Sequence, residues 1–386
     1  MHILKLIYKN ILRHRLRSLL TVAGIAIAVM AFGLMRTVVT AWYSGVEASA
    51  ANRLVTVHSV SFIFPLPLSY KGRIEQVPGV KKVSFANWFQ GVYVDKNQFF
   101  ARLAVDPETV WDVFPELIVS DKVKQALKET RNGCVIGEKL VSQYHLKVGD
   151  IMNVEGDIYP GQWQFQVVGV YDKRDETVDD SQMMFNWHYL DEQLHETSPS
   201  RASHVGWYVV ASSDPNRRAD ISKSIDNLFA NSPAETKTQT EKEFQQSFVS
   251  MSGAIITAIN VVSFVIIGII LLVLSNTMVM TARERIREYA VMKTLGFSLG
   301  HLSGMIAGES LLISCIGGAI GLGITFPLAA MIHKGLPAGW FPIFSVETAT
   351  VLFAVVAAIM AGFVASLFPI VRATRMSIVE GLRHIG

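Results

Sequence analysis

GAIITAINVVSFVIIGIILLVLSNTMVMTA (Gly253–Ala282) is a stretch of 30 residues without a charged side chain. About 20 apolar residues in a helix cross the hydrocarbon core of a bilayer, so this stretch is long enough to span a membrane. Three further stretches of roughly 18 or more residues share this property: Ser18–Met35, Ser310–Ile332 and Thr348–Val371. The sequence therefore predicts an α-helical membrane protein with four transmembrane helices.

The segment between the first and second apolar stretches is polar, and we expect it to fold as an inserted α+β domain with flanking stalk helices at residues 42–247. β-branched and aromatic residues predict strands at Leu54–Ser59, Phe99–Val105, Trp163–Val170 and Val205–Val210. Two overlapping capping boxes, Thr240 with Glu243 or Thr238 with Glu241, predict a helix that leads into the second span.

The distribution of charge orients the chain. Residues 42–247 carry 21 Lys and Arg against 27 Asp and Glu, whereas the rest carries 14 against 5. Short cytoplasmic loops are enriched in Lys and Arg. The basic clusters flank three of the apolar stretches: Lys5, Lys9, Arg13, Arg15 and Arg17; Arg283, Arg285, Arg287 and Lys293; Arg372, Arg375 and Arg383. We expect both termini in the cytoplasm and the inserted domain outside, and no nucleic-acid partner, because each cluster adjoins a membrane stretch.

These patterns give provisional boundaries. The spans are placed at 18–41, 248–282, 303–332 and 348–371, with a short outer loop at 333–347 and a cytoplasmic tail at 372–386. Residues 1–17 are expected to form a cytoplasmic amphipathic helix on the membrane surface, or simply a basic flank. An uncleaved anchor is favoured over a signal peptide, because Ala48-Ser49-Ala50 lies far beyond an apolar run that is itself too long for one.

Three features inside the apolar stretches carry hypotheses about packing and charge. Small residues four apart, Gly24 with Ala28 and Gly317 with Gly321, fit close helix contacts in a membrane. Glu309 is an acid beside an apolar stretch, and such a group is a functional candidate. An ion pair with a nearby Arg, or a place among the headgroups, is favoured over proton relay, since no second carboxylate accompanies it.

The motifs of the common catalytic sites are absent from the sequence. No G-x-x-x-x-G-K-[ST], H-E-x-x-H or G-x-S-x-G occurs, and the histidines are scattered. We therefore expect neither an enzyme nor a bound cofactor or metal. Cys134 and Cys315 are not expected to form a disulfide framework. Four aromatic residues are interpreted as core rather than as an exposed site: Trp88, Phe89, Phe99 and Phe100.

The segment TARERIREYAVMKTLGFS (Thr281–Ser298) differs from the other connections. Its interleaved acids and bases with a short apolar face predict an amphipathic helix at 283–297, which ends at Leu295-Gly296. Arg285 and Tyr289 are expected on its polar side. We interpret it as a docking surface for a cytoplasmic partner rather than a solvated loop, carried by Arg283, Glu284, Arg285, Arg287, Glu288, Met292, Lys293, Leu295 and Gly296.

Four segments together resemble a known family. TARERIREYAVMKTLGFS…IAGESLLISCIGGAIGLGI and SLFPIVRATRMSIVEGLRHIG are similar to the C-terminal module of FtsX-like ABC transporter permeases, and LIYKNILRHRLRSLLTVAGIAIAV to their N-terminal anchor. GCVIGEKLVSQYHLKVGDIMNVEG…FQVVGVYD resembles the periplasmic core domain of MacB-type permeases. The order and spacing of these segments make the resemblance specific.

The resemblance implies a permease subunit of the mechanotransmission (type VII) class in the bacterial inner membrane, with its large domain in the periplasm. It implies a homo- or heterodimer of permeases, and a partner ATPase that binds ATP and Mg and docks on a coupling helix at Arg283–Gly296. A membrane-fusion protein and an outer-membrane channel complete the route in many relatives. Only 17 residues precede the first span, so the ATPase is expected on a separate chain.

Two alternatives remain open beside export from the periplasm or outer leaflet. A lipoprotein-releasing permease would need a lipid-accessible cavity between the stalk helices. A non-transporting transducer that controls a cell-wall hydrolase is disfavoured, because the resemblance implies a smaller outer domain for that group.

Overall fold

The computed structural model describes residues 15–50, 52–96, 98–175, 178–336 and 344–377. The chain forms two compact units. The helical unit comprises residues 1–40, 253–334 and 344–386, and the α/β unit comprises residues 41–252 and 335–343. Most of the α/β unit is thus inserted between the first long helix and the second.

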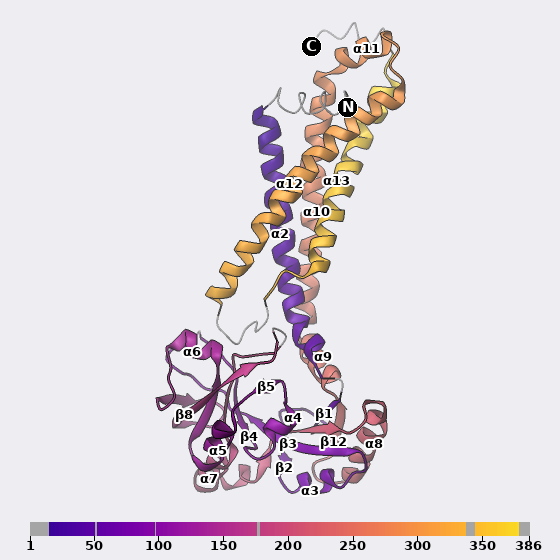
Figure 1. Ribbon diagram of the computed structural model, residues 1–386. Coiled ribbons are helices and arrows are strands. Elements are labelled where there is room, and N and C mark those ends of the chain that lie inside the picture. The colour runs from indigo at the N-terminus through magenta and orange to yellow at the C-terminus, as the bar shows by residue number, and fades with distance from the viewer. Residues whose placement is uncertain (1–14, 51, 97, 176–177, 337–343, 378–386) are drawn as a thin grey trace. The chain divides into compact units, whose positions relative to one another are not determined.

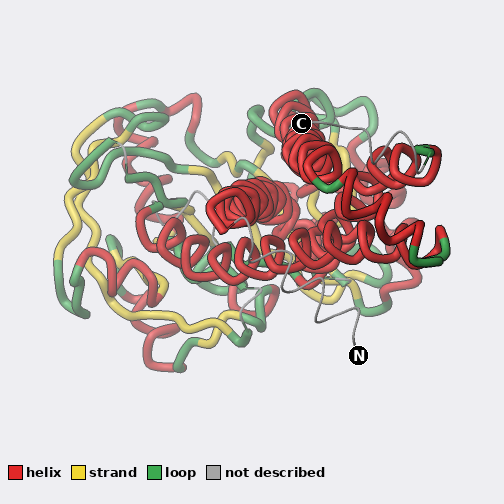
Figure 2. The backbone as a smooth tube through the Cα atoms, turned by 90° about the horizontal axis from the view of Figure 1, so that it is seen from above, coloured by secondary structure: helices red, strands yellow, loops and turns green. Residues whose placement is uncertain are grey.

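Four long helices build the helical unit: α2 (Arg15–Ala48), α10 (Gly253–Glu284), α12 (Leu299–Gly335) and α13 (Thr348–Arg375). The shortest has 28 residues, and all four are apolar enough to cross a membrane. At 1.5 Å per residue, 28 residues reach about 42 Å, which exceeds the roughly 30 Å of a hydrocarbon core. α12 crosses the other three at an angle, as the two views show (Figures 1 and 2). The predicted fold class is confirmed.

The helices differ from the predicted spans at their ends. α2 starts before residue 18 and runs past residue 41, and α12 starts at Leu299 rather than at 303. The second span is predicted from 248, but helix α9 (Glu241–Met251) ends before Ser252 and α10 starts at Gly253. Ser and Gly are weak helix formers, which accounts for the interruption. The predicted helix at 1–17 and the tail at 372–386 fall mostly outside the described residues, and so do residues 337–343 of the predicted loop at 333–347.

The α/β unit contains a ten-stranded mixed sheet in the order β12-β1-β11-β3-β4-β9-β6-β8-β5, with β7 paired to β8, and a separate β2–β10 pair. The pairs β4–β9 and β6–β8 are parallel, and the others are antiparallel. The strands are β1 (Arg53–His58), β2 (Leu66–Pro67), β3 (Val80–Trp88), β4 (Arg102–Val105), β5 (Leu117–Ile118), β6 (Gly133–Gly137), β7 (Ile151–Gly156), β8 (Gly161–Lys173), β9 (Met183–Asn186), β10 (His204–Val205), β11 (Trp207–Ser212) and β12 (Thr236–Thr240).

Helices cover both faces of this sheet. Successive residues of a strand point to opposite faces, so a strand with apolar residues throughout contributes to a core on each side. In β6, Cys134 and Ile136 join one apolar core, whereas Val135 between them joins the other. The larger core lies under α3 (Tyr70–Glu75), α6 (Glu138–Tyr144), α7 (Trp187–Thr197) and α8 (Arg218–Phe229), and the smaller one under α4 (Val110–Val113) and α5 (Asp121–Glu129). Two short 3-10 helices, η1 (Pro199–Arg201) and η2 (Pro215–Arg217), complete the unit.

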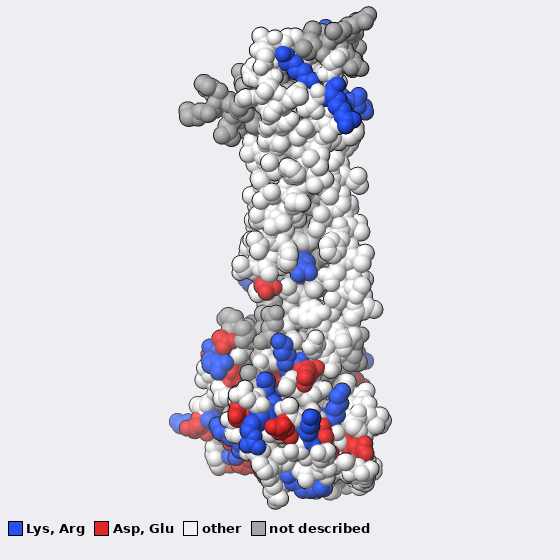
Figure 3. Space-filling view, turned by 90° about the vertical axis from the view of Figure 1, so that its right-hand side faces the viewer, with Lys and Arg blue, Asp and Glu red and all other residues white. Residues whose placement is uncertain are grey.

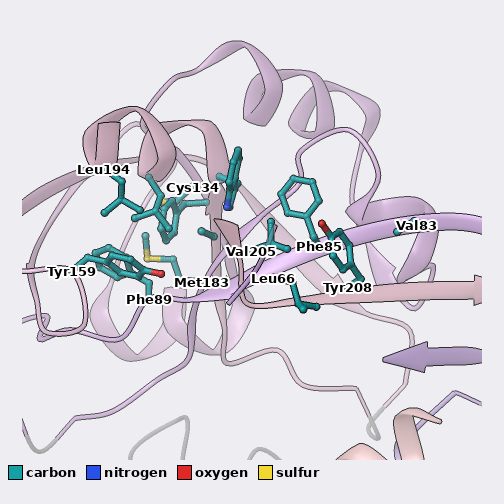
Figure 4. Close-up of a cluster of buried hydrophobic side chains, with 14 of the residues drawn as sticks. Leu66, Val83, Phe85, Phe89, Cys134, Tyr159, Met183, Leu194, Val205 and Tyr208 are labelled. Carbon is teal, nitrogen blue, oxygen red and sulfur yellow. The ribbon is translucent and has the colours of Figure 1, made fainter. Parts of the chain in front are cut away.

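The larger core is rich in aromatic side chains, part of which Figure 4 shows. Phe89 is fully buried and meets the Trp163 ring edge-on at 5.1 Å between centroids. The Tyr208 hydroxyl donates a hydrogen bond to the Pro67 carbonyl oxygen at 2.6 Å, so the polar end of this side chain has a partner inside the core. Of the four aromatics interpreted as core, Phe89 and Phe100 are fully buried, whereas Trp88 is 37% exposed and Phe99 half-buried.

One of the two alternative capping boxes forms. The Thr240 hydroxyl accepts from the Glu243 backbone N–H at 3.2 Å, and the Thr240 N–H donates to the Glu243 carboxylate at 2.8 Å. The other box cannot form because Thr238 lies in β12, where its N–H donates to Asp226. The box therefore fixes the start of α9, the helix that immediately precedes α10.

Candidate functional site

The charged connection between α10 and α12 folds as a short helix, α11 (Ile286–Thr294). Its predicted start at residue 283 differs from the structure, since Arg283 and Glu284 form the last turn of α10. At its end Gly296 takes a left-handed backbone with φ of 86°. The N–H of Phe297 donates to Met292 O and that of Gly296 to Lys293 O, both at 3.1 Å. This is the Schellman pattern, which ends helices where a glycine can adopt positive φ.

The inner side of α11 is buried, which corrects the prediction that Arg285 and Tyr289 lie on an exposed polar side. Both residues are only 4% exposed. Arg285 Nη1 donates to Glu309 Oε2 of α12 at 2.9 Å, and both side chains are at least nine-tenths buried. Tyr289 packs with Leu302 and other apolar residues of α12 and α13. Glu309 therefore forms an ion pair with an Arg, the first alternative that the sequence left open.

Lys293 ties the other end of α11 to α13. Its Nζ donates to the carbonyl oxygens of Thr374 at 3.1 Å and Met376 at 2.7 Å. These carbonyls end α13, where the helix leaves oxygens without intrahelical donors and carries a partial negative charge. Met292 is half-buried in the same apolar cluster. α11 is thus held to α12 by Arg285 and to α13 by Lys293.

Glu284 also belongs to the bundle rather than to the outer side of α11. Its two carboxylate oxygens accept from the two Nη atoms of Arg17 in α2, both at 2.7 Å. Bidentate pairs of this kind fix orientation as well as distance. Four of the nine residues predicted for the docking surface, Glu284, Arg285, Met292 and Lys293, therefore contact other helices.

The outer side of α11 is exposed and mixes cations with apolar side chains. Exposed residues recur every four positions at Arg283, Arg287, Val291 and Leu295, and Leu295 is 72% exposed. Phe297 and Leu299, which follow the helix, are 48% and 53% exposed. We call Arg283, Arg287, Val291, Leu295, Phe297 and Leu299 the α11 surface. Two other residues predicted for docking lie beside it: Gly296 ends the helix, and Glu288 is half-buried. Figure 3 shows basic side chains at the α11 end of the helical unit above a long surface nearly free of charge.

The predicted glycine contact in α12 packs against α2. A Cβ on Gly317 would lie 2.8 Å from Ile25, and one on Gly321 would lie 2.5 Å from the Ala26 carbonyl oxygen. A third contact, which the sequence analysis missed, brings Gly33 against Thr325. The residue numbers rise together along both helices, so α2 and α12 run in the same direction. Successive membrane spans alternate in direction, so the first and third of four spans are expected to be parallel.

The other predicted pair, Gly24 with Ala28, makes a looser contact. A Cβ on Gly24 would meet only Val273 of α10, at 3.7 Å, which is ordinary van der Waals distance. Ala28 is half-buried against the apolar cluster of the four helices. The close approach of α2 and α12 therefore depends on Gly317, Gly321 and Gly33 rather than on the predicted pair Gly24 and Ala28.

α13 presents a seam of small residues that the sequence analysis did not single out. Its buried positions include Ala354, Ala358, Ala361, Gly362 and Ala365. The hydroxyl of Ser310 in α12 donates to the Gly362 carbonyl oxygen at 2.7 Å, and that of Ser314 donates to Ala358 O. Small residues let the backbones approach closely enough for these bonds. The three-and-four spacing of Ala and Gly in 350–373 is the signal that would have revealed it.

A buried arginine in the α/β unit joins the two ends of that unit, and the sequence analysis missed it too. Arg53 is 4% exposed; its Nε donates to Glu241 at 2.8 Å, and its Nη1 forms an ion pair with Glu116. Burial opposes its charge, yet these carboxylates raise the pKa of Arg53 above its usual value. The N–H of Ala50 donates to the same Glu241 carboxylate at 2.8 Å. Arg53 therefore locks the chain segment that enters the unit to α9, which leaves it.

In the described part of the chain, no group of three His, Cys, Asp or Glu side chains could hold a metal ion. Cys134 is buried in the larger core, and Cys315 is exposed on α12; both are free thiols. The arrangement presents exposed charged and apolar side chains on a helix whose inner side is fixed to the bundle.

Two family models match the chain. The one described as MacB-like periplasmic core domain matches residues 18–228, more than half of the chain, and the one described as FtsX-like permease C-terminal matches residues 260–378. The two together cover most of each of the four long helices and most of the α/β unit, whose β12 and α9 lie between the two matches.

Named relatives agree with these models. The uncharacterized ABC transporter permease MJ1507 of Methanocaldococcus jannaschii is 23% identical over 345 residues, which cover 84% of this chain and 83% of the relative. The uncharacterized ABC transporter permease YknZ of Bacillus subtilis is 31% identical over 123 residues, 31% of this chain and 30% of the relative. The macrolide export ATP-binding/permease protein MacB of Nitrobacter winogradskyi is 33% identical over 133 residues, 34% of this chain and 19% of that protein.

Two solved structures are similar to part of the chain. The periplasmic region of MacB from Actinobacillus actinomycetemcomitans aligns with a TM-score of 0.36 and 14% identity, covering 53% of this chain and 95% of that region. The extracellular domain of YknZ from Gram-positive bacteria aligns with a TM-score of 0.35 and 14% identity, covering 49% of this chain and all of that domain.

Proposed function

Because the chain belongs to the family of MacB-like and FtsX-like ABC transporter permeases, we propose that it is the membrane-spanning subunit of an ABC exporter powered by a partner ATPase. The observation that carries the proposal is the α11 surface: exposed cations and apolar side chains on a helix whose inner side is fixed to the bundle. A groove on the ATPase would receive this surface. ATP and Mg are bound by that partner, not by this chain.

The polar contacts of α11 give a route for movement into the membrane helices. When the ATPases close on ATP, α11 moves with them. Arg285 passes this displacement to α12 through Glu309, and Lys293 passes it to α13 through the carbonyls that end that helix. Arg17 with Glu284 keeps α2 and α10 together at the same end. The bundle therefore responds as one body rather than as four independent helices.

The α/β unit is built to receive that movement through both of its chain connections. The antiparallel pairing of Leu54 with Thr240 joins β1 to β12, and the Arg53–Glu241 ion pair lies directly beside it. Movement of either connection is thus shared with the other, and through Glu116 with the rest of the sheet. We propose that the unit expels substrate by this transmitted motion, as a dimer with a second permease copy, and that a membrane-fusion protein and outer-membrane channel extend the route.

We propose that the α11 end of the helical unit and both termini lie on the cytoplasmic side with the ATPase. Arg283, Arg287 and Arg372 at that end support this orientation, because short cytoplasmic segments are enriched in Lys and Arg. The α/β unit then faces the periplasm of a bacterial cell.

The experiment is a gentle purification of the tagged chain from its native membranes, followed by identification of what is bound to it. Recovery of a stoichiometric soluble protein with a P-loop supports the proposal, and a co-purifying membrane-fusion protein favours export over lipoprotein release. Recovery of the chain alone, or with a cell-wall hydrolase and no ATPase, would contradict it.

A further inference from the structure

An apolar loop on the α/β unit is exposed although the unit has a complete core. The loop SVSFIFP (59–65) connects β1 to β2. Val60 and Ile63 are 75% and 77% exposed, among the highest values for large apolar side chains of the described residues, and Phe64 is 51% exposed. Three such residues within five positions form a patch, not the scattered exposure that soluble surfaces tolerate.

The loop is held in place by aromatic contacts with α9. The rings of Phe62 and Phe248 lie 4.9 Å apart, and those of Phe248 and Phe244 lie 5.0 Å apart. The N–H groups of Val60 and Phe64 donate to His58 and to the Ser61 carbonyl, which fixes the turn. The exposed side chains therefore sit on an ordered support rather than on a free coil.

Chain connectivity keeps this support close to a membrane span. Phe248 precedes Gly253, the first residue of α10, by five residues. Even a fully extended chain of five residues reaches only about 17 Å, and a helical one about 8 Å. The headgroup layer of a bilayer is several ångströms thick on each side of the hydrocarbon core. The patch is thus within reach of the lipids that surround α10.

The polar residues around the patch suit lipid headgroups. A groove between the loop and α9 is lined by Phe62, Phe244 and Phe248 on one side and by Lys237 and Gln239 of β12 on the other. Lys237 is the charged residue of that lining, and it is exposed, as is Lys242 on α9. Aromatic side chains beside cations are the composition of segments that lie in the membrane interface.

We propose that the loop 59–65 inserts into the interfacial layer of the bilayer that holds the chain's own spans, with Ile63 and Phe64 among the lipid chains and Lys237 at the phosphates. The loop anchors the α/β unit to the membrane surface beside the exit helix α9. The inference requires only that the four helices span a membrane, so it stands independently of the ATPase partner.

The test is spin-label accessibility in the full chain reconstituted into phosphatidylcholine–phosphatidylglycerol vesicles. A nitroxide is placed at Ile63→Cys in a Cys315→Ser background, since the remaining Cys134 is fully buried. Two reference sites calibrate the measurement: Leu272→Cys, 71% exposed on α10, for lipid, and Leu228→Cys, 39% exposed on α8, for water. Collisions with oxygen and with a water-soluble nickel chelate are compared at each site.

We expect the oxygen-to-nickel ratio at Ile63 to exceed that at Leu228 by severalfold and to approach that at Leu272. A ratio equal to that at Leu228 overturns the proposal. Spin–spin broadening at Ile63 that disappears on dilution with unlabelled protein also overturns it, because the patch would then cover a second copy. The Leu272 and Leu228 readings, each taken on its own variant in vesicles of the same composition, give the lipid and water limits of the measurement.

Discussion

Arg285 and Glu309 form an ion pair at 2.9 Å in which neither side chain is more than 9% exposed. The pair joins the start of α11 to α12 across 24 residues of sequence, at the end of the bundle where the partner ATPase is proposed to bind. A buried pair of this kind holds two elements in one relative position, but it does so at a desolvation cost that only the partner charge offsets.

Breaking this pair should therefore be costly, whereas replacing it should not. Removing one partner of a buried pair typically costs about 3–5 kcal/mol, while an apolar replacement of both is often neutral. We expect Arg285→Met and Glu309→Leu each to lower the thermal unfolding midpoint of the helical unit, followed by far-ultraviolet circular dichroism in nanodiscs. The double variant should recover most of the loss. Two losses that simply add in the double variant would show that the pair is not coupled.

The contact of α12 with α2 predicts a contrast between two glycines of the same helix. A Cβ on Gly321 would lie 2.5 Å from the Ala26 carbonyl oxygen, whereas one on Gly323 meets nothing within 4 Å. Overpacking a close contact costs about 1–3 kcal/mol, and alanine is the better helix former by up to about 1 kcal/mol. Gly321→Ala should lower the unfolding midpoint in nanodiscs, and Gly323→Ala should leave it unchanged or raise it. Equal effects of the two would contradict this packing.

Arg53 should matter far more to the α/β unit than an exposed arginine does. Arg53→Met leaves the Glu116 and Glu241 carboxylates without their cation, at an expected cost of about 3–5 kcal/mol. The control Arg131→Met removes the exposed surface pair with Glu192, which solvent screens and which should contribute little to stability. Five of the seven tryptophans lie in strands and helices of the α/β unit, so the thermal midpoint from intrinsic fluorescence reports mainly on this unit: Trp88, Trp111, Trp163, Trp187 and Trp207. Similar thermal midpoints for the two variants would mean that the ion pairs of Arg53 do not stabilise the α/β unit more than a surface pair does.

Charge reversal on the α11 surface should separate docking from membrane insertion. We expect Arg283→Glu with Arg287→Glu to weaken binding of the ATPase by about thirtyfold and so to reduce the amount recovered with the chain, since two exposed charge contacts of about 1 kcal/mol each sum to about 2 kcal/mol. The amount of chain in the membrane should not change. Lys122→Glu with Lys223→Glu, an equal reversal on exposed positions of the α/β unit, serves as the control. Normal ATPase recovery and transport with the α11 variant would remove the coupling role from this surface.

The four spans could be predicted from the sequence because their signal is local. Thirty uncharged residues from Gly253 to Ala282 leave few alternatives to a membrane helix, and the capping box at Thr240 needs only its own four residues. The end of α11 at Gly296 is equally local, since positive φ favours glycine.

The inner contacts of α11 could not be predicted in the same way. Periodicity places Arg285 among charged neighbours and therefore predicts exposure, but its partner Glu309 lies in another helix. The ion pairs of Arg53 are even harder to predict from the sequence, since its partners Glu116 and Glu241 are 63 and 188 residues away. Charge patterns identify the residues that are able to pair; which of them do pair depends on tertiary contacts that no local rule contains.

Site-specific photocrosslinking from the α11 surface is the most direct test of the central claim. A benzophenone amino acid replaces Leu295, which is 72% exposed at the tip of this surface, and in a second variant it replaces Leu228 on α8. After illumination of intact cells, we expect the Leu295 probe, and not the Leu228 probe, to form a covalent adduct with a soluble protein that contains a P-loop. An adduct of that protein with the Leu228 probe, or none with the Leu295 probe while the two co-purify, would contradict the account.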